Sequence, residues 1–224
     1  MQETDNKIVL VDICDTLFDS NTTFDFLDEY IFLKQYKWIR HFFKHYFGRI
    51  INGCLWRIFR LDLLRFLVFR FIKGHSKISL LEAADRFYEN NLVLKKKEYV
   101  FELLEQFKIQ KYHIILVSAT IDFIAETVAK KNNIATCYST TLEYKNDICN
   151  GKIATDLLGI KRRILGENGF HPPYYAVVTD NTSDIDLVKT SQFAYIIITS
   201  GNFKKWKRII QKNQLNNVKL LPTL

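Results

Sequence analysis

The chain has 224 residues, of which 48% are hydrophobic and 25% charged, so it is a globular protein of one large domain or of a core domain with an insertion. This composition excludes a disordered chain, a collagen-like repeat and a scaffold held by disulfide bonds. The net charge is +8, but residues 31–73 contain ten Lys or Arg and one acid and carry +9, which leaves −1 for all other residues. The same segment holds 12 of the 32 aromatic residues. A basic, aromatic insertion therefore interrupts a nearly neutral chain.

Four short apolar segments, rich in Ile and Val, have the pattern of buried strands. They are residues 7–13, 113–119, 174–180 and 193–199. Helical patterns at 122–132 and 183–191 follow the second and third of these strands, and a further helical pattern at 159–167 precedes the third strand. Strands that alternate with helices indicate a parallel sheet covered by helices.

The long stretch between the first two strands, residues 24–108, contains no convincing strand and is expected to be helical. Ser79 and Glu82 have the spacing of a capping box before a helix. From Phe32 to Tyr46 apolar residues recur every three or four positions, and basic residues follow the same spacing on another face. This stretch is therefore predicted to be a set of helices inserted into the α/β protein.

Residues 142–153 contain Asn150-Gly151 and are expected to form a hairpin that turns at this pair. With the strands and helices, this predicts the fold class: α/β, a Rossmann-like parallel sheet core with a helical cap inserted after the first strand. The expected domains are a core at 1–22 and 91–224 and a cap at 23–90.

The N-terminus and the cysteines favour a cytoplasmic protein. The first residues, MQETDNK, lack the basic region of a secretory signal, and no run of 18 uncharged apolar residues exists. The four cysteines (Cys14, Cys54, Cys137 and Cys149) show neither CxxC pairs nor zinc-ligand spacing, so we expect free, buried thiols. Peripheral attachment to the inner face of the membrane is left open.

Polar residues follow the predicted strands where the strands end, which is where ligands bind in a parallel sheet. They are Asp12, Thr16, Ser118, Thr120, Asp180 and Asp184, and Lys161 opens a helix between them. Mg²⁺ typically uses one or two carboxylates together with substrate phosphate. A lysine and hydroxyls would complete a phosphoryl site, in which an aspartate can act as nucleophile. Singly these residues are explained as well by turns, caps and a solvated lysine, but together they favour phosphoryl chemistry.

The same residues resemble the motifs of the haloacid dehalogenase superfamily of aspartate-nucleophile hydrolases, in its phosphoserine phosphatase-like branch. The matching segments are VLVDICDTLF at Asp12, ILVSAT at Ser118, GIKRRIL at Lys161 and VVTDNTSD at Asp180 and Asp184. The resemblance spans residues 7–200 and is specific at these four motifs. Residues 24–90 match the helical cap of the family by position.

The resemblance implies a nucleophile and a metal site. Asp12 would be the nucleophile and a ligand of Mg²⁺, and the backbone carbonyl of Cys14 and the side chain of Asp180 would be further ligands. Asp184 would support the metal site through ordered water or through Lys161.

The resemblance also implies a substrate site. Thr16 and Ser118 would hold phosphate oxygens, and Lys161 would balance the charge on the nucleophile and the phosphoryl group. The implied function is an Mg²⁺-dependent phosphomonoester phosphatase that forms a phosphoaspartate and acts on a small phosphorylated substrate.

The chain departs from the family at Cys14, which stands where the phosphatases carry a second aspartate that protonates the leaving group and then activates water. A thiol with a pKa near 8.5 is a poor proton donor to the leaving group and a poor base toward water. General acid–base catalysis increases the rate of a reaction by about 10²–10⁴-fold. Three interpretations stay open. Asp15 takes over this role, the substrate has a leaving group that needs little protonation, or the chain is a phosphate-binding or scaffolding protein with little turnover.

The basic segment 31–73 also has three interpretations. In the first interpretation, the segment is an interfacial membrane element, as in a membrane-lipid phosphatase. Trp38 and Trp56 would then lie at the acyl boundary and the Lys and Arg side chains at anionic head groups. In the second, the segment is a nucleic-acid patch, which is disfavoured because no nucleic-acid motif accompanies it. Or its aromatics form the core of the cap and its charges are solvated, helped by dimerisation; the oligomeric state is left open.

Two other groups of charged residues are expected on the surface. His41 and His45 have the i, i+4 spacing of metal ligands but lack a third ligand, so a solvated face is expected. Lys95–Lys97 are expected to form a solvated turn before the next helix.

Overall fold

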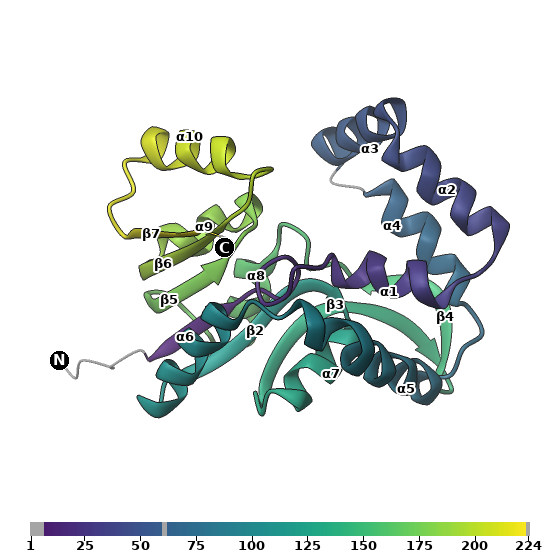
Figure 1. Cartoon of the computed structure of the whole chain (residues 1–224), viewed down its shortest axis with the longest axis horizontal. Coiled ribbons are helices and arrows are strands. Elements are labelled where there is room, and N and C mark those ends of the chain that lie inside the picture. Colours follow the sequence, from purple (N-terminus) through teal and green to yellow (C-terminus); the bar gives the residue numbers. More distant parts are fainter. Residues whose placement is uncertain (1–6, 60–61, 223–224) are drawn as a thin grey trace.

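The computed structural model describes residues 7–59 and 62–222, without the side chains of Trp56 and Phe59. A seven-stranded sheet crosses the molecule in the order β4-β3-β2-β1-β5-β6-β7 (Figure 1). Its strands are β1 (Ile8–Val11), β2 (His113–Ile121), β3 (Thr136–Lys145), β4 (Ile148–Thr155), β5 (Tyr174–Thr179), β6 (Ser191–Ile198) and β7 (Val218–Pro222). All neighbours pair in parallel except β3 and β4. The four predicted strands are confirmed as β1, β2, β5 and β6, and so is the fold class.

Two apolar cores cover the two faces of the sheet, which is why the central strands are apolar throughout. In β1, Val9 and Val11 face one core and Leu10 faces the other, and all three are fully buried. The first core is covered by α6 (Glu98–Ile109) and α7 (Asp122–Lys131). The second is covered by α8 (Lys161–Glu167), α9 (Ile185–Lys189) and α10 (Phe203–Asn213). The helices predicted at 122–132, 159–167 and 183–191 are confirmed as α7, α8 and α9.

The chain between β1 and β2 is helical, and none of its described residues from 24 to 108 belongs to a strand of the sheet, as predicted. Its α-helices are α1 (Thr22–Tyr30), α2 (Lys34–Lys44), α3 (Tyr46–Phe59), α4 (Leu63–Val68), α5 (Lys77–Phe87) and α6. The predicted cap of α5 was wrong by three residues. The hydroxyl of Ser76, not that of Ser79, accepts a hydrogen bond from the first turn, at 3.1 Å from the Ser79 nitrogen.

The inserted helices α1, α2, α4 and α5 all contribute buried side chains to the first core, among them Tyr36 of α2 and Leu64 of α4. Helices α1 and α5 belong to the first core, where the Phe26 ring lies 5.6 Å from Phe87 and 5.2 Å from Phe123 of α7. Helices α2, α3 and α4 rise away from the sheet (Figure 1). The division into a cap at 23–90 and a core remains a prediction.

The hairpin predicted at 142–153 is confirmed as β3 and β4, but its turn was misplaced. The chain turns at Asn146 and Asp147, whose φ angles are both positive, at 50° and 61°. Gly151 lies within β4 with φ +69°, and a Cβ there would lie 3.0 Å from the Cα of Arg70 and the carbonyl oxygen of Phe69. The glycine therefore permits a close backbone approach rather than a turn.

Candidate active site

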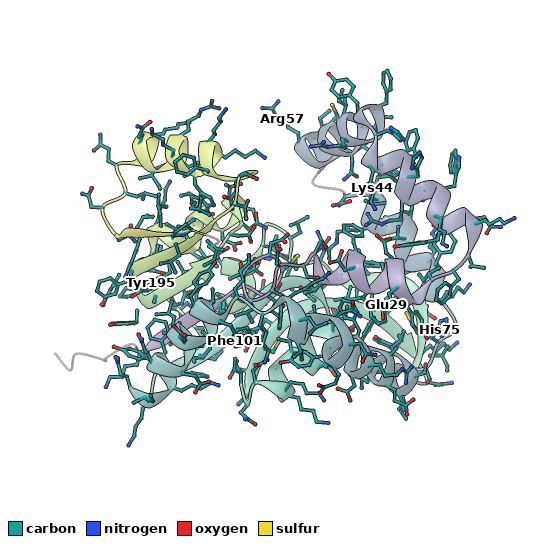
Figure 2. The ribbon with its side chains drawn as sticks, in the orientation of Figure 1. Glu29, Lys44, Arg57, His75, Phe101 and Tyr195 are labelled. Carbon is teal, nitrogen blue, oxygen red and sulfur yellow. The ribbon has the colours of Figure 1, made fainter. Side chains whose placement is uncertain are left out.

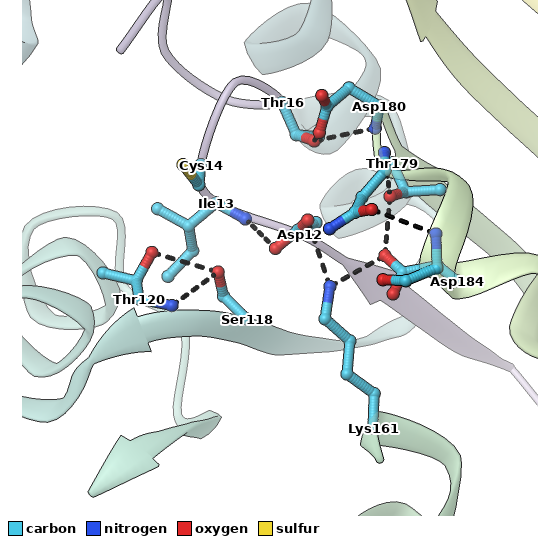
Figure 3. A network of polar contacts seen from close by, with 12 residues as sticks. Asp12, Ile13, Cys14, Thr16, Ser118, Thr120, Lys161, Thr179, Asp180 and Asp184 are labelled. Atoms are coloured by element: carbon cyan, nitrogen blue, oxygen red, sulfur yellow. Dashed lines mark hydrogen bonds and ion pairs between the residues drawn. The ribbon is translucent and has the colours of Figure 1, made fainter. Parts of the chain in front are cut away.

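The polar residues predicted at the strand ends meet at one edge of the sheet (Figure 3). Lys161, at the start of α8, places its Nζ 3.0 Å from Asp12 Oδ2 and 2.7 Å from Asp184 Oδ2. All three residues are less than 5% exposed. Burial by itself lowers the pKa of Lys161, but the two carboxylates outweigh it and raise that pKa. The ammonium is therefore protonated and ties the end of β1 to the end of β5.

Asp12 is held from two sides. One carboxylate oxygen accepts a hydrogen bond from the backbone nitrogen of Ile13 at 2.8 Å, and the other contacts Lys161. Asp12 also lines a cavity of about 200 Å³. The other lining residues are Cys14, Asp15, Asn21, Thr23, Phe24, Asp62, Arg65, Ser118, Ala119, Thr120, Leu158, Asp180 and Asn181. A fixed carboxylate thus faces a small, partly polar cavity.

The side chain of Thr16, which was predicted to contact phosphate, contacts Asp180 in the structure. Its hydroxyl donates to Asp180 Oδ1 at 3.1 Å and accepts from the Asp180 nitrogen at 3.0 Å. Thr16 is fully buried and is not among the residues that line the cavity. Thr16 therefore positions Asp180, and its expected contact with phosphate remains a prediction.

Ser118 lines the cavity, at the end of a chain of hydroxyls, and its expected contact with phosphate remains a prediction. Its Oγ lies 3.1 Å from Thr120 Oγ1, which lies 2.9 Å from Thr22 Oγ1 of α1. These contacts connect β2 to the first inserted helix and fix the Ser118 hydroxyl beside the cavity.

The loop after β1 carries the residues that depart from the family pattern. Cys14 Sγ lies 3.9 Å from Asp15 Oδ2, and Asp15 has a φ of +52°, a conformation that glycine adopts more readily. Burial, followed by the charges of Asp15 and Asp12, raises the pKa of the Cys14 thiol, so the thiol stays protonated. Lys97 donates to the backbone carbonyl of Asp15 and is buried, so the prediction of a solvated turn was wrong for this lysine.

A family model of the haloacid dehalogenase-like hydrolases matches residues 9–189. The chain belongs to this family. The resemblance drawn from the four motifs is thereby confirmed. A comparison with curated proteins gave no match.

Solved structures share the fold of this hydrolase. A Bordetella pertussis Tohama I protein of unknown function is 15% identical, with a TM-score of 0.71 over 94% of this chain and 96% of that one. A phospho-aspartyl intermediate analogue of phosphoserine phosphatase is 15% identical, with a TM-score of 0.56 over 93% and 98%. A cytosolic 5′-nucleotidase IIIB bound to cytidine is 9% identical, with a TM-score of 0.64 over 96% and 81%. At these identities the similarity shows the fold.

The charge of the cavity in this hydrolase suits a hard cation. Asp12, Asp15 and Asp180 all line it, and burial followed by the charges of Asp12 and Asp15 raises the pKa of Asp180 to about 7. Lys161 is shared between Asp12 and Asp184, and its charge lowers the pKa of Asp180 by less than burial, Asp12 and Asp15 together raise it. Mg²⁺ prefers oxygen ligands of this kind.

The side chains alone do not form a complete metal cage. Within residues 7–59 and 62–222, no three or more His, Cys, Asp or Glu are grouped so as to hold a metal ion. Asp184 is not a lining residue and contacts Lys161 and the Thr179 hydroxyl instead. Asp12 and Asp180 remain as side-chain candidates, with the Cys14 carbonyl and substrate oxygens to complete a Mg²⁺ site. Such a set fits Mg²⁺, which keeps few protein ligands.

Arg65 of α4 is a site residue that the sequence analysis missed. Its Nη2 donates to the Ala119 carbonyl at 2.8 Å and to Thr140 Oγ1 at 3.0 Å, and it lies 3.2 Å from Asp156 Oδ1. Its Nε is buried and finds no hydrogen-bond partner among the described residues. The available signal was a single arginine within the apolar run LDLLRFLVF, next to the buried Leu64.

Proposed function

We propose that this hydrolase is a Mg²⁺-dependent phosphomonoester phosphatase with Asp12 as its nucleophile. The observation that carries the proposal is the carboxylate of Asp12, held by the Ile13 nitrogen and Lys161 at a cavity that Ser118 and Asp180 also line. The similarity in fold to phosphoserine phosphatase and to a cytosolic 5′-nucleotidase supports the same class of reaction.

In the first half-reaction, a carboxylate oxygen of Asp12 attacks phosphorus, an Asp12–phosphorus bond forms and the bond to the leaving oxygen breaks. The leaving oxygen takes a proton from water. Lys161 stabilises the charge on Asp12, and the Ser118 hydroxyl donates to a phosphoryl oxygen. Mg²⁺, held by Asp12, Asp180 and the Cys14 carbonyl, would neutralise charge on the phosphoryl group.

In the second half-reaction, a water molecule attacks phosphorus, and the bond to Asp12 breaks to release inorganic phosphate. The proton of that water passes to solvent or to the phosphate. Cys14 contributes little to either proton transfer, because its thiol has a raised pKa and stays protonated. We therefore expect the enzyme to prefer substrates whose leaving group needs little protonation.

The test is hydrolysis of a chromogenic aryl phosphate, whose phenolate leaves without a proton. Wild type should turn over with Mg²⁺ and stop with a chelator. Asp12→Asn should lose about 10³-fold or more, whereas Asp19→Asn, a matched change at an exposed position of the same loop, should not. Activity that is independent of Mg²⁺ or untouched by Asp12→Asn would contradict the mechanism.

A second candidate function is phosphate binding with little turnover, and Cys14 is the observation that favours it. Cys14→Asp should raise turnover of an alkyl phosphate by about 10²–10⁴-fold if only the acid/base group is missing. The binding function is favoured instead if wild type and Cys14→Asp both bind phosphate with Mg²⁺ by calorimetry and neither hydrolyses aryl phosphate.

A further inference from the structure

Helix α3 has its apolar side exposed to solvent. Tyr46 and Phe47 are each 74% exposed and Ile58 is 69% exposed, and Ile50 and Ile51 are also exposed. At 100° per residue, these five side chains fall within an arc of about 140°. We call them the α3 apolar face.

The opposite side of α3 provides its packing. Asn52 accepts a hydrogen bond from the Leu64 nitrogen of α4 at 3.2 Å. Gly48 lies against α2, where a Cβ would be 2.3 Å from the Phe42 carbonyl oxygen. The α3 apolar face is therefore unpartnered within the described chain, and the neighbouring helices expose further apolar side chains. Of the seventeen large apolar side chains that are exposed in the described residues, nine lie between Phe32 and Phe66.

Exposed cations are frequent on α2 and α3, and within the described residues only Lys44 among them contacts an acid, Asp28 of α1 at 3.7 Å. Exposed Lys or Arg residues of α2 and α3 are Lys34, Lys37, Lys44, Arg49 and Arg57, two of which are labelled in Figure 2. The one acid of residues 31–73, Asp62, caps α4 and accepts from Asn52 at 3.1 Å. The charge of this surface is therefore strongly positive.

Helix α10 adds a second basic surface, which faces the same upper side of the molecule as α3 in Figure 1. It carries five exposed cations and no acid: Lys204, Lys205, Lys207, Arg208 and Lys212. Its buried Trp206 donates to the Asp180 carbonyl at 2.7 Å, which anchors α10 beside the candidate active site. Figure 1 shows α3 and α10 rising on either side of that site.

The candidate active site opens toward α3. A second hollow of about 430 Å³ is lined by Arg49, Asn52 and Gly53 of α3, and by residues 181–183 after β5. It shares Asp62, Leu158 and Asn181 with the cavity at Asp12. A surface that contacts α3 and α10 together would therefore lie over the opening of the site.

We propose that the α3 apolar face, with the flanking cations of α2 and α10, docks onto an anionic lipid bilayer. Apolar and aromatic side chains ringed by Lys and Arg are the features of helices that lie in the membrane interface. No helix of the described residues has the length and apolar character needed to cross a bilayer, so contact is with the surface. This inference goes beyond the proposed function and does not depend on it.

A bilayer fits this surface better than a second copy of the chain, because two copies would bring two segments of +9 together. A nucleic acid would match the cations but would leave the five apolar side chains of α3 in a polar, hydrated interface. The observed combination of apolar centre and basic rim therefore favours lipid.

The test is co-sedimentation with vesicles of mixed phosphatidylcholine and phosphatidylglycerol, compared with pure phosphatidylcholine, at low and high salt. We expect binding to the anionic vesicles that weakens with salt. The double variant Ile50→Glu/Ile58→Glu, and separately Lys204→Glu/Lys205→Glu, should each reduce binding about tenfold or more. Ile109→Glu, a matched change at a 79% exposed position of α6, should bind like wild type.

A second readout is the fluorescence of Trp38, which is 69% exposed on α2 and should shift to the blue with anionic vesicles. Absence of binding at low salt would overturn the proposal, and so would equal binding to both vesicle types. Self-association abolished by Ile50→Glu/Ile58→Glu, without vesicle binding, would show that a second copy covers the face. Turnover of the water-soluble aryl phosphate should be the same in all these variants, so failure of docking is separable from failure of the proposed function.

Discussion

A single buried ammonium sets the electrostatics of the candidate active site. Lys161 contacts both Asp12 and Asp184, so one positive charge serves two buried carboxylates. On the other side of Asp12, the carboxylate of Asp180 accepts a hydrogen bond from the Thr16 hydroxyl and, within the described residues, has no cation of its own in contact. The excess negative charge therefore falls on the carboxylate that faces the cavity, which is where a cation would be held.

This charge distribution predicts how the stability of the metal-free protein depends on pH. Burial and the charges of Asp12 and Asp15 raise the pKa of Asp180 to about 7 in the folded protein, from about 3.8 for an aspartate exposed to water in the unfolded chain. Between these values the unfolded chain releases a proton that the folded protein retains. Stability should therefore fall as pH rises from about 4 to 7, by up to about 1.4 kcal/mol per pH unit from this group.

The measurement is urea unfolding in chelator across this range, for wild type and Asp180→Asn. The asparagine oxygen can still accept from Thr16, so the variant should fold and should show a flatter dependence on pH. Identical slopes for the two proteins would contradict the prediction. Added Mg²⁺ should stabilise wild type more at pH 8 than at pH 6, because at the higher pH the ion no longer competes with a proton.

The sequence predicted the motif residues of the site, but it did not predict the residues that contact them. Asp12, Ser118 and Lys161 follow from strand ends and order along the chain. The burial of Lys97 could not be inferred, because a lysine within a run of three lysines is usually solvated. Its contact with the Asp15 carbonyl exists only once α6 is placed against the loop after β1. Long-range contacts of this kind leave no local pattern.

At the scale of elements, Arg65 connects α4 to three strands of the sheet or to the residues next to them. Its guanidinium contacts Ala119 in β2, Thr140 in β3 and Asp156 just after β4. Arg65 has 8% of its side chain exposed and Asp156 29%, so the pair is partly buried and its attraction is only partly screened. This contact fixes one wall of the cavity at Asp12.

A double-mutant cycle measures this contact. Arg65→Met should lower the free energy of unfolding by more than Asp156→Asn, because it also frees the Ala119 carbonyl and the Thr140 hydroxyl. We expect a coupling energy between Arg65 and Asp156 of about 0.5–3 kcal/mol in urea unfolding. Arg49→Met, a matched change at an exposed arginine, should have little effect. Additive effects of the two substitutions would show that the ion pair contributes nothing.

The hairpin of β3 and β4 was predicted from a local sequence signal, but the position of its turn was not. Asn-Gly is a strong hairpin signal, so Asn150-Gly151 was the natural choice of turn. The observed turn, Asn146-Asp147, also suits positive φ, and the register of β3 against β4 selects it. Sequence therefore predicted the hairpin, but contacts with the inserted helices decided where glycine was needed.

Gly151 provides a direct test of that contact. In Gly151→Ala the residue would keep φ near +69°, and its Cβ would press on the backbone of Phe69 and Arg70. We expect a loss of about 2–3 kcal/mol in the free energy of unfolding. Gly53→Ala is the control, since its Cβ would meet nothing within 4 Å in a helix, and a gain of up to about 1 kcal/mol is expected. Equal effects of the two alanines would contradict this account.

For the whole molecule, charge is segregated more sharply than the sequence totals indicate. Residues 31–73 carry +9 and α10 carries +5 of a net +8, which leaves −6 on the rest of the chain. The basic residues of α10 are evident in the sequence. They do not appear in the net charge of all residues outside 31–73, because acids elsewhere in the chain cancel their charge. The sheet order places β6 and β7, and α10 between them in the chain, at the edge opposite the hairpin, so α10 lies across the candidate active site from α3.

The packing of the inserted helices leads to a prediction about whether they unfold together. Helices α1 and α5 share the core of the sheet, where Phe26 packs against Phe123. Helix α3 rises from the sheet and exposes much of its apolar surface, whereas α2 buries Tyr36 and Phe43 in the same core as α1 and α5. The inserted helices should therefore not behave as one unit, although a single cap was predicted for residues 23–90.

Native-state hydrogen exchange tests this prediction. Amides of α1 and α5 should exchange only by global unfolding, with the protection of β1 and β2. Amides of α3 should exchange through local opening, with protection at least about tenfold lower, because little apolar surface is lost when α3 detaches. If α1 to α5 instead share one level of protection that differs from that of the sheet, residues 23–90 open as a single unit. Anionic vesicles should raise the protection of α3 selectively, since only its apolar face would gain a partner.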